Sequence, residues 1–209
     1  MSEVKLISIT PNAEQLIAYC ARVSNPDNQD NEATAGRLLK YMLKHGHYSP
    51  FEMAHAVLEI KAPRDITRQI LRHRSFSFQE FSQRYAQVMD FTDRLPRLQD
   101  SKNRQNSLPL EPADWRNVEW AKICVKRTLS VAKWCYEHAL EMGIAKEVAR
   151  VLLPEGLTQS TLYMAGSIRS WIHYCQLRMQ LDTQVEHREI AHACWEIITK
   201  ELPVLATIQ

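Results

Sequence analysis

The sequence has little glycine and lacks a glycine-rich phosphate loop. Only five of its 209 residues are glycine, and neither a Gly-x-Gly-x-x-Gly pattern nor a phosphate-loop pattern occurs. A Rossmann crossover and a nucleoside triphosphatase loop are therefore excluded, because both need glycines where the backbone approaches phosphate closely. A nucleotide bound by this chain must be held by side chains.

Cysteine and metal-binding patterns are also sparse. The five cysteines are odd in number, widely spaced and without a Cys-x-x-Cys pair, which argues against a disulfide framework or a zinc knuckle. His187 and His192 superficially resemble a zinc-protease helix, but their five-residue spacing puts them about 140° apart around a helix. We therefore predict no metal site.

Long apolar runs and a strong net charge are missing as well. No run of about 18 apolar residues is present, and the first residues lack the layout of a signal peptide. We expect a cytoplasmic protein without a membrane partner, in the host cytoplasm if the source is a virus. The net charge of +2 is too small for a protein that coats nucleic acid through bulk electrostatics.

The apolar patterns predict one domain over residues 1–209, mostly helical with a small sheet. Strands are expected at 4–9 and 54–61, and residues 156–165 are ambiguous between strand and loop. Thr10 is expected to cap a helix with Pro11 in its first position. Further helices are expected to end at Gly46, to begin at Pro63, and to cover 113–142, 145–153, 167–179 and 183–202.

Arginine is concentrated in one part of the chain. Residues 62–100 contain seven arginines and no lysine, and planar guanidinium groups suit bidentate contacts with phosphate. Arg64, Arg68 and Arg72 lie four residues apart, so a helix would place them in one unfavourable stripe of like charge. Two explanations remain open: a bound anion, or pairing with carboxylates such as Asp65, Glu80 or Asp90.

A polar and aromatic segment follows the arginines. Hydroxyl, amide and carboxyl groups alternate there with Phe76, Phe78, Phe81 and Tyr85. Directional hydrogen bonds and aromatic stacking are what recognition of a base requires. The two segments together favour a nucleotide site.

The spacing Arg72-His73-Arg74, seven residues, then Ser82 resembles the Arg-His-Arg-x7-Ser motif of the flavin-dependent thymidylate synthases. The resemblance extends across nearly the whole chain, through residues 21–24, 45–52, 80–85, 148–150, 177–178 and 184–186. It implies an α+β fold, mostly helical with a small antiparallel sheet, and an enzyme that makes dTMP from dUMP. The cofactor is FAD, with NADPH and 5,10-methylenetetrahydrofolate as co-substrates, and the implied assembly is a homotetramer with active sites between subunits.

The resemblance also implies roles for individual residues. The residues expected to bind the flavin are Ser24, His47, Ser49, Arg72, His73, Arg74, Glu80, Ser167, Arg169 and His173. Those expected to bind dUMP are Gln69, Arg72, Glu80, Ser82, Arg84, Arg150 and Arg178.

Arg178 is the predicted catalytic residue. A hydride accepted at carbon 6 of uracil requires a polarised ring, and an arginine at the imide edge stabilises the developing negative charge. Ser82 is assigned to substrate positioning, because an unassisted serine hydroxyl is a weak nucleophile. Ser167, His173 and Asp182 depart from residues found in many relatives, so flavin or folate contacts in that part of the chain can differ.

Three alternatives stay open. A related enzyme could transfer a hydroxymethyl group to the pyrimidine monophosphate. The chain could instead be a flavoprotein that has lost its activity, as the changes at Ser167 and His173 would allow. The most remote alternative is a module that binds nucleic acid through the arginine stripe; we otherwise expect no nucleic-acid partner.

Overall fold

A four-stranded antiparallel sheet forms the centre of the molecule. The computed structural model describes residues 2–208. The strand order is β1-β2-β6-β3, and every neighbouring pair is antiparallel. The strands are β1 (Glu3–Ile9), β2 (His55–Pro63), β3 (Ser77–Glu80) and β6 (Gln159–Ser167). This agrees with the predicted α+β class, and the ambiguous segment 156–165 contributes most of β6.

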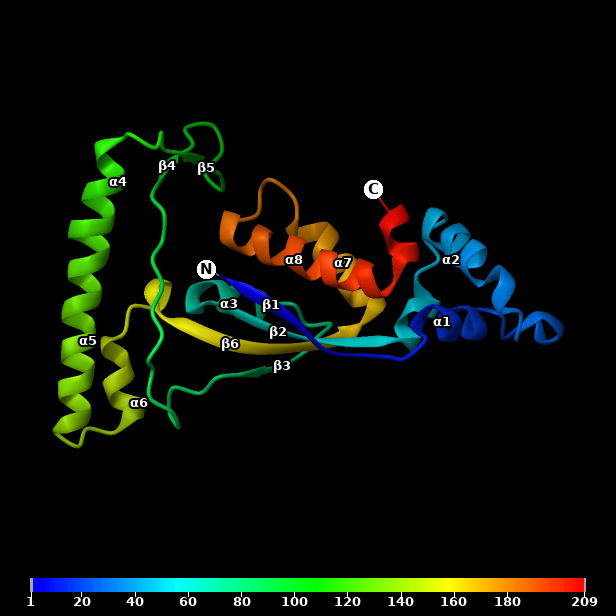
Figure 1. Ribbon diagram of the computed structural model, residues 1–209, viewed down its shortest axis with the longest axis horizontal. Helices are drawn as coiled ribbons and strands as arrows, with labels where there is room; N and C mark the ends of the chain where they lie inside the picture. The colour runs from blue at the N-terminus through cyan, green and yellow to red at the C-terminus, as the bar shows by residue number, and fades with distance from the viewer. Residues whose placement is uncertain (1, 209) are drawn as a thin grey trace.

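One face of the sheet carries the main core because the side chains of β2 and β6 alternate between buried and less buried. Leu58 and Ile60 of β2 and Leu162 and Met164 of β6 have no exposed surface. Two helices, α7 (Ile168–Arg178) and α8 (Val185–Glu201), cover this face, as Figure 1 shows. The sheet and these helices therefore share one continuous hydrophobic cluster.

Two further groups of helices lie at opposite ends of the sheet (Figure 1). At one end are α1 (Ala13–Ala21) and α2 (Ala35–Lys44). At the other end are α5 (Lys126–Glu141) and α6 (Lys146–Ala149), which pack with Val88 and Leu153 in a second, smaller apolar cluster. The short helix α3 (Arg64–Ile70) follows β2 directly.

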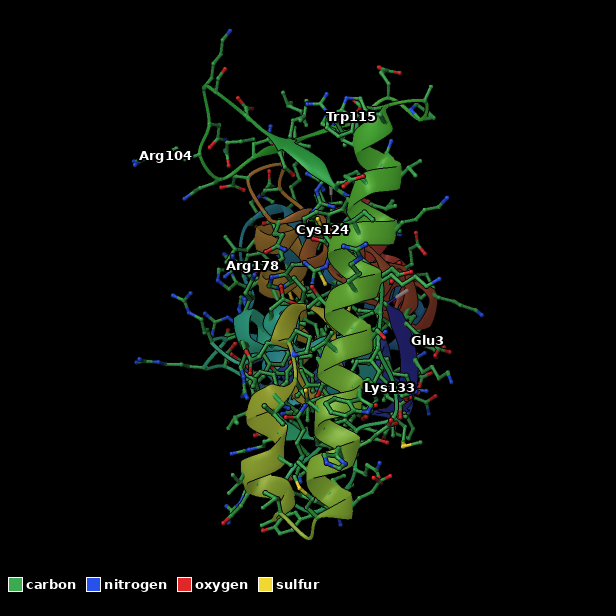
Figure 2. All side chains as sticks on the ribbon, turned by 90° about the vertical axis from the view of Figure 1, so that its left-hand side faces the viewer. Glu3, Arg104, Trp115, Cys124, Lys133 and Arg178 are labelled. Atoms are coloured by element: carbon green, nitrogen blue, oxygen red, sulfur yellow. The ribbon has the colours of Figure 1, made fainter. Side chains whose placement is uncertain are left out.

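The predicted helix over 113–142 is present, with an irregular middle. It consists of α4 (Trp115–Glu119), a π-helical segment over Trp120–Val125, and α5. The Trp120 indole N–H donates a 2.6 Å hydrogen bond to the carbonyl oxygen of Arg94 and so ties this helix to the preceding loop. Gly143, with φ of +79°, ends the helix as expected. Figure 2 shows the helix in front of the rest of the molecule.

The loop over residues 90–111 contains a small hairpin that the sequence analysis did not predict. Its strands are β4 (Arg97–Gln99) and β5 (Ser107–Pro109). They pair antiparallel, with Leu98 opposite Leu108.

Two local predictions were wrong. Thr10 does not cap a helix: its hydroxyl lies 2.9 Å from the amide nitrogen of His55, and α1 begins only at Ala13 after a left-handed Asn12. Helix α3 ends at Ile70, so Arg72 lies beyond it and the predicted three-arginine stripe does not form. In both cases the surrounding tertiary structure overrides a local sequence pattern.

Within residues 2–208, none of the helices is long and apolar enough to cross a membrane. The same part of the chain contains no group of three or more His, Cys, Asp or Glu residues arranged to hold a metal ion.

Candidate nucleotide site

The predicted catalytic residue Arg178 lies against His73, although 105 residues separate them in sequence. Arg178 is the last residue of α7, and its Nε donates a 2.9 Å hydrogen bond to His73 Nε2. His73 must therefore be neutral with its proton on Nδ1. Burial first, and then the charges of Arg178, His173 and Arg72, lower the pKa of His73 to about 4. A neutral His73 can thus orient Arg178 through this hydrogen bond without repelling its positive charge.

Behind this pair, Gln69 of α3 contacts two residues near the start of α8. Its Nε2 donates a 2.7 Å hydrogen bond to Oε1 of Gln184. Its Oε1 lies 3.3 Å from Nδ1 of His187, whose Nε2 lies 3.2 Å from the Tyr174 hydroxyl. From the sequence, His187 was considered only as a metal ligand, and Tyr174 was assigned no role. Both residues could have been noticed because they are polar side chains on otherwise apolar helix faces.

Glu80, expected between flavin and dUMP, is held by groups of its own chain. Its Oε1 accepts 2.9 Å hydrogen bonds from the hydroxyls of Thr67 and Ser160. Arg64 Nη1 lies 3.7 Å from the same oxygen, and Arg68 Nη1 lies 3.4 Å from the other. Glu80 therefore has fixed neighbours on several sides.

The same contacts explain the two arginines that do share α3. Arg64 and Arg68 both pair with Glu80 and Glu155, at distances of 3.3 to 3.7 Å. Their repulsion is offset by carboxylates of the protein, which was one of the two explanations left open. These arginines consequently do not form a free surface for nucleic-acid phosphates.

Arg72 and Arg74 differ from these paired arginines. Both are exposed, and within residues 2–208 neither guanidinium group makes a hydrogen bond or an ion pair. Arginines on either side of His73 without an internal partner are suited to bind the phosphates of a nucleotide.

A cavity of about 360 Å³ lies beside α7 and brings together two of the predicted flavin residues, Arg169 and His173. Arg169 Nη1 donates a 2.8 Å hydrogen bond to Glu52 Oε1. A hydrogen bond from Ser167 and the contact with Arg169 lower the pKa of Glu52 despite some desolvation. The other lining residues are Tyr48, Glu52, Ser75, Ser170, Ile172 and Gln176.

Three predicted flavin residues come from the α1–α2 end of the sheet. His47 and Ser49 are exposed and follow α2, and the His47 ring lies 6.2 Å from that of His45. Ser24 lines a separate hollow with Arg22 and Tyr41. Within the described part of the chain, no hydrogen bond or ion pair joins these three residues to Arg178 or His73.

Three predicted dUMP residues gather near α6. The Arg84 guanidinium pairs with the Glu147 carboxylate at 3.4 Å, and Arg150 Nε donates a 3.2 Å hydrogen bond to the Glu147 carbonyl oxygen. Ser82 Oγ lies 3.4 Å from the Arg84 amide nitrogen. Among residues 2–208, no hydrogen bond or ion pair links this group to Arg178, His73 or Gln69. A single chain therefore presents two separate clusters of predicted dUMP residues.

Comparison with known proteins identifies the family of this chain. The family model described as thymidylate synthase complementing protein matches residues 5–204. A probable flavin-dependent thymidylate synthase of Paramecium bursaria Chlorella virus 1 is 51% identical over 210 residues, covering 97% of this chain and 96% of the relative. The flavin-dependent thymidylate synthase of Synechocystis sp. is 45% identical over 214 residues, covering 98% and 97%.

A solved structure has the same fold. The UMP/dUMP methylase PolB from Streptomyces cacaoi, bound with 5-Br dUMP, superposes with a TM-score of 0.83 at 28% identity, covering 98% of this chain and 92% of the other. The family match spans nearly the whole chain, and two relatives exceed 40% identity over at least 96% of their lengths. The chain therefore belongs to the family of flavin-dependent thymidylate synthases.

Proposed function

We propose that this protein converts dUMP to dTMP by reductive methylation, with FAD as cofactor, 5,10-methylenetetrahydrofolate as carbon donor and NADPH as reductant. The observation that carries the proposal is the Arg178–His73 pair. Its 2.9 Å bond uses only Nε of Arg178 and leaves both Nη groups for a ligand. A guanidinium fixed in this way can stabilise negative charge at the imide edge of a uracil ring.

The residues fit a flavin nucleotide. Arg72 and Arg74 supply exposed guanidinium groups for its phosphates, and Arg169 and His173 line the adjacent cavity. When bound, the flavin would relay a hydride from the nicotinamide to the pyrimidine substrate. In this proposal the Arg-His-Arg segment holds FAD, and Ser24, His47 and Ser49 contribute from the α1–α2 end.

The active site is proposed to form between subunits of a homotetramer. Two observations support this assembly. The predicted dUMP residues lie in two groups that no hydrogen bond or ion pair joins within residues 2–208. The continuous helix from α4 to α5 (residues 115–141), here called the long outer helix, exposes Trp115, Val131 and Trp134. Arg84 and Arg150 of one subunit would then bind the dUMP phosphate beside Arg178 and Gln69 of another. A cytoplasmic location stays a prediction.

The direct test is to purify the protein, look for a flavin absorbance band, and follow NADPH oxidation with and without dUMP. We expect bound FAD, dUMP-dependent turnover and a product heavier than dUMP by one CH2 unit. Failure to bind FAD, even when it is added, would overturn the proposal. A product that carries a hydroxymethyl group would favour the related hydroxymethylase instead.

The solved neighbour favours a second substrate to be tested. It is described as a UMP/dUMP methylase and was also determined with 5-Br UMP. Parallel assays with UMP and dUMP would show whether this chain accepts the ribonucleotide.

A further inference from the structure

A chain of five buried or half-buried polar side chains lies behind the proposed dUMP site. It runs from Tyr174 through His187, Gln69 and Gln184 to Glu186, and we call it the Gln69 chain. The successive distances between its polar atoms are 3.2, 3.3, 2.7 and 3.1 Å. Its members come from α3, α7 and the start of α8, so the tertiary fold assembles it.

The carboxylate at one end favours one direction for every hydrogen bond in the chain, and the Tyr174 hydroxyl at the other end reinforces it. Burial would raise the pKa of Glu186, but hydrogen bonds, chiefly from Arg97, outweigh burial and lower it. An ionised Glu186 can only accept, so Gln184 must turn its NH2 group toward Glu186 and its carbonyl oxygen toward Gln69. Gln69 must then donate to Gln184 and turn its own carbonyl oxygen toward His187.

The same logic determines the tautomer of His187. Its Nδ1 faces the Gln69 carbonyl oxygen and must carry the proton, which leaves Nε2 to accept from the Tyr174 hydroxyl. Burial first, and then the charges of Arg178 and His73, lower the pKa of His187 to about 3, so it is neutral near pH 7. Burial also raises the pKa of Tyr174 well above its ordinary value, which keeps the hydroxyl proton available.

We propose that Tyr174 and His187 are positioning residues that fix the amide of Gln69 in one orientation toward the nucleotide. A flipped amide would put N–H against N–H at His187 and oxygen against oxygen at Gln184, leaving buried groups unpaired. In the fixed orientation Gln69 keeps one N–H and one oxygen lone pair for a ligand. This inference rests on the proposed function, in which Gln69 binds dUMP.

Both positioning residues also pack beside the Arg178–His73 pair. The His73 ring lies 4.9 Å from that of Tyr174 and 6.3 Å from that of His187, between ring centres, and meets both edge to face. The Gln69 amide and the Arg178 guanidinium are therefore held by one shared group of rings.

The first test replaces Tyr174 by Phe, which removes only the donor to His187. With FAD and saturating co-substrates, we expect Tyr174→Phe to raise the KM for dUMP about threefold to tenfold, the effect of one weakened hydrogen bond. We expect kcat to change less than about twofold and FAD binding to stay the same. The matched control is Tyr163→Phe, which removes an exposed hydroxyl bonded to Glu59 at 2.8 Å and should change neither value.

The second test reads the tautomer directly in protein labelled with 15N in histidine rings. The His187 signal, assigned by its loss in His187→Asn, should show the proton on Nδ1 in the wild type and a mixture of tautomers in Tyr174→Phe. A wild-type proton on Nε2 would overturn the proposed direction. An unchanged KM in Tyr174→Phe would overturn the role in positioning.

A pair of variants at His187 covers the case in which Tyr174→Phe does not fold. Asn retains an N–H donor near the place of Nδ1, whereas Leu has a similar size and no donor. We expect His187→Asn to keep the KM for dUMP within about twofold and His187→Leu to raise it as Tyr174→Phe does; equal values would overturn the inference. If the wild type binds FAD but not dUMP, the proposed substrate and the positioning role both fail, while the tautomer signal still decides the direction of the Gln69 chain.

Discussion

The sheet with its covering helices differs from the long outer helix in how many of its side chains find partners within one chain. Around α7 and α8, apolar side chains are buried, and each polar side chain of the Gln69 chain contacts the next one through a hydrogen bond. On the outer helix, Trp115 is 71% exposed and Trp134 is 65% exposed. Large exposed apolar side chains grouped on one element mark an interaction surface. The side chains of the first region therefore find their partners within one chain, whereas the second is the surface at which we propose contact with another copy.

The largest effect is expected at Arg178, at the end of α7, where we propose that the first region carries the chemistry. Arg178→Ala removes the group proposed to stabilise charge on the uracil ring, so dTMP formation should fall at least about 100-fold. Bound FAD, followed by its absorbance, should remain. Arg188→Ala on α8 removes a guanidinium that bonds only the Leu181 carbonyl oxygen, at 3.3 Å, among described residues, and it should leave activity nearly unchanged. Full activity of Arg178→Ala would remove Arg178 from its role.

The outer helix can be tested by placing charge on its exposed apolar face. The double change Val131→Asp and Trp134→Asp should dissociate the assembly and lower activity at least about tenfold, because buried unpaired carboxylates oppose association. Light scattering after size exclusion measures the mass, and circular dichroism checks that the helix still forms. Lys133→Asp, on a different side of the same helix, is the control. An assembly of unchanged mass in the double variant would contradict this interface.

Two buried or half-buried histidines predict how the stability of the protein responds to acid. The pKa values of His73 and His187 are lowered to about 4 and about 3, below the ordinary value of 6.5, so the unfolded chain binds more protons. The stability that neutral histidine provides is present above pH 6.5 and is lost as the pH falls toward these values, by up to about 1.4 kcal/mol per pH unit for each residue.

Melting temperatures measured between pH 7 and pH 4.5 test this expectation. His187→Asn cannot take up a proton, so its melting temperature should fall less steeply with pH than that of the wild type. His192→Asn, at an exposed position of α8, should follow the wild-type curve. Parallel curves for all three proteins would show that burial of His187 does not govern acid sensitivity.

The smallest effect is expected from packing at the sheet. A Cβ on Gly166 of β6 would lie 2.4 Å from the Phe76 ring, so Gly166→Ala should lower the free energy of unfolding by about 1–3 kcal/mol. Gly36 in α2 has no atom within 4 Å of such a Cβ, and Gly36→Ala should leave stability unchanged or raise it by up to about 1 kcal/mol. Chemical denaturation measures both. Equal stability of Gly166→Ala and the wild type would mean that Phe76 can move aside easily.

Much of the secondary structure could be predicted from the sequence because it depends on local periodicity. The alternation of β2, the long apolar repeat that ends at Gly143, and the final helix α8 all follow patterns of two or 3.6 residues. The π-helical segment over Trp120–Val125 escaped, since it leaves the helical pattern almost unchanged. The Thr10 cap was wrong because its hydroxyl is used by His55, which is 45 residues away.

The candidate site was predictable only in part. The Arg-His-Arg-x7-Ser spacing was enough to indicate the family, which the comparisons confirm. The roles of individual residues and the single-domain organisation stay predictions. His187 was missed as a nucleotide-site residue because its partner Gln69 lies 118 residues away.

By itself the sequence determined which residue types are available and which short segments form helices and strands, because those depend on neighbours within a few residues. Only the tertiary structure decided which arginines are free and which are neutralised. Arg64 and Arg68 pair with Glu80 and Glu155, while Arg178 reaches His73 from the end of α7. Such pairs depend on how the sheet and α7 and α8 pack together, and no local spacing in the chain encodes that packing.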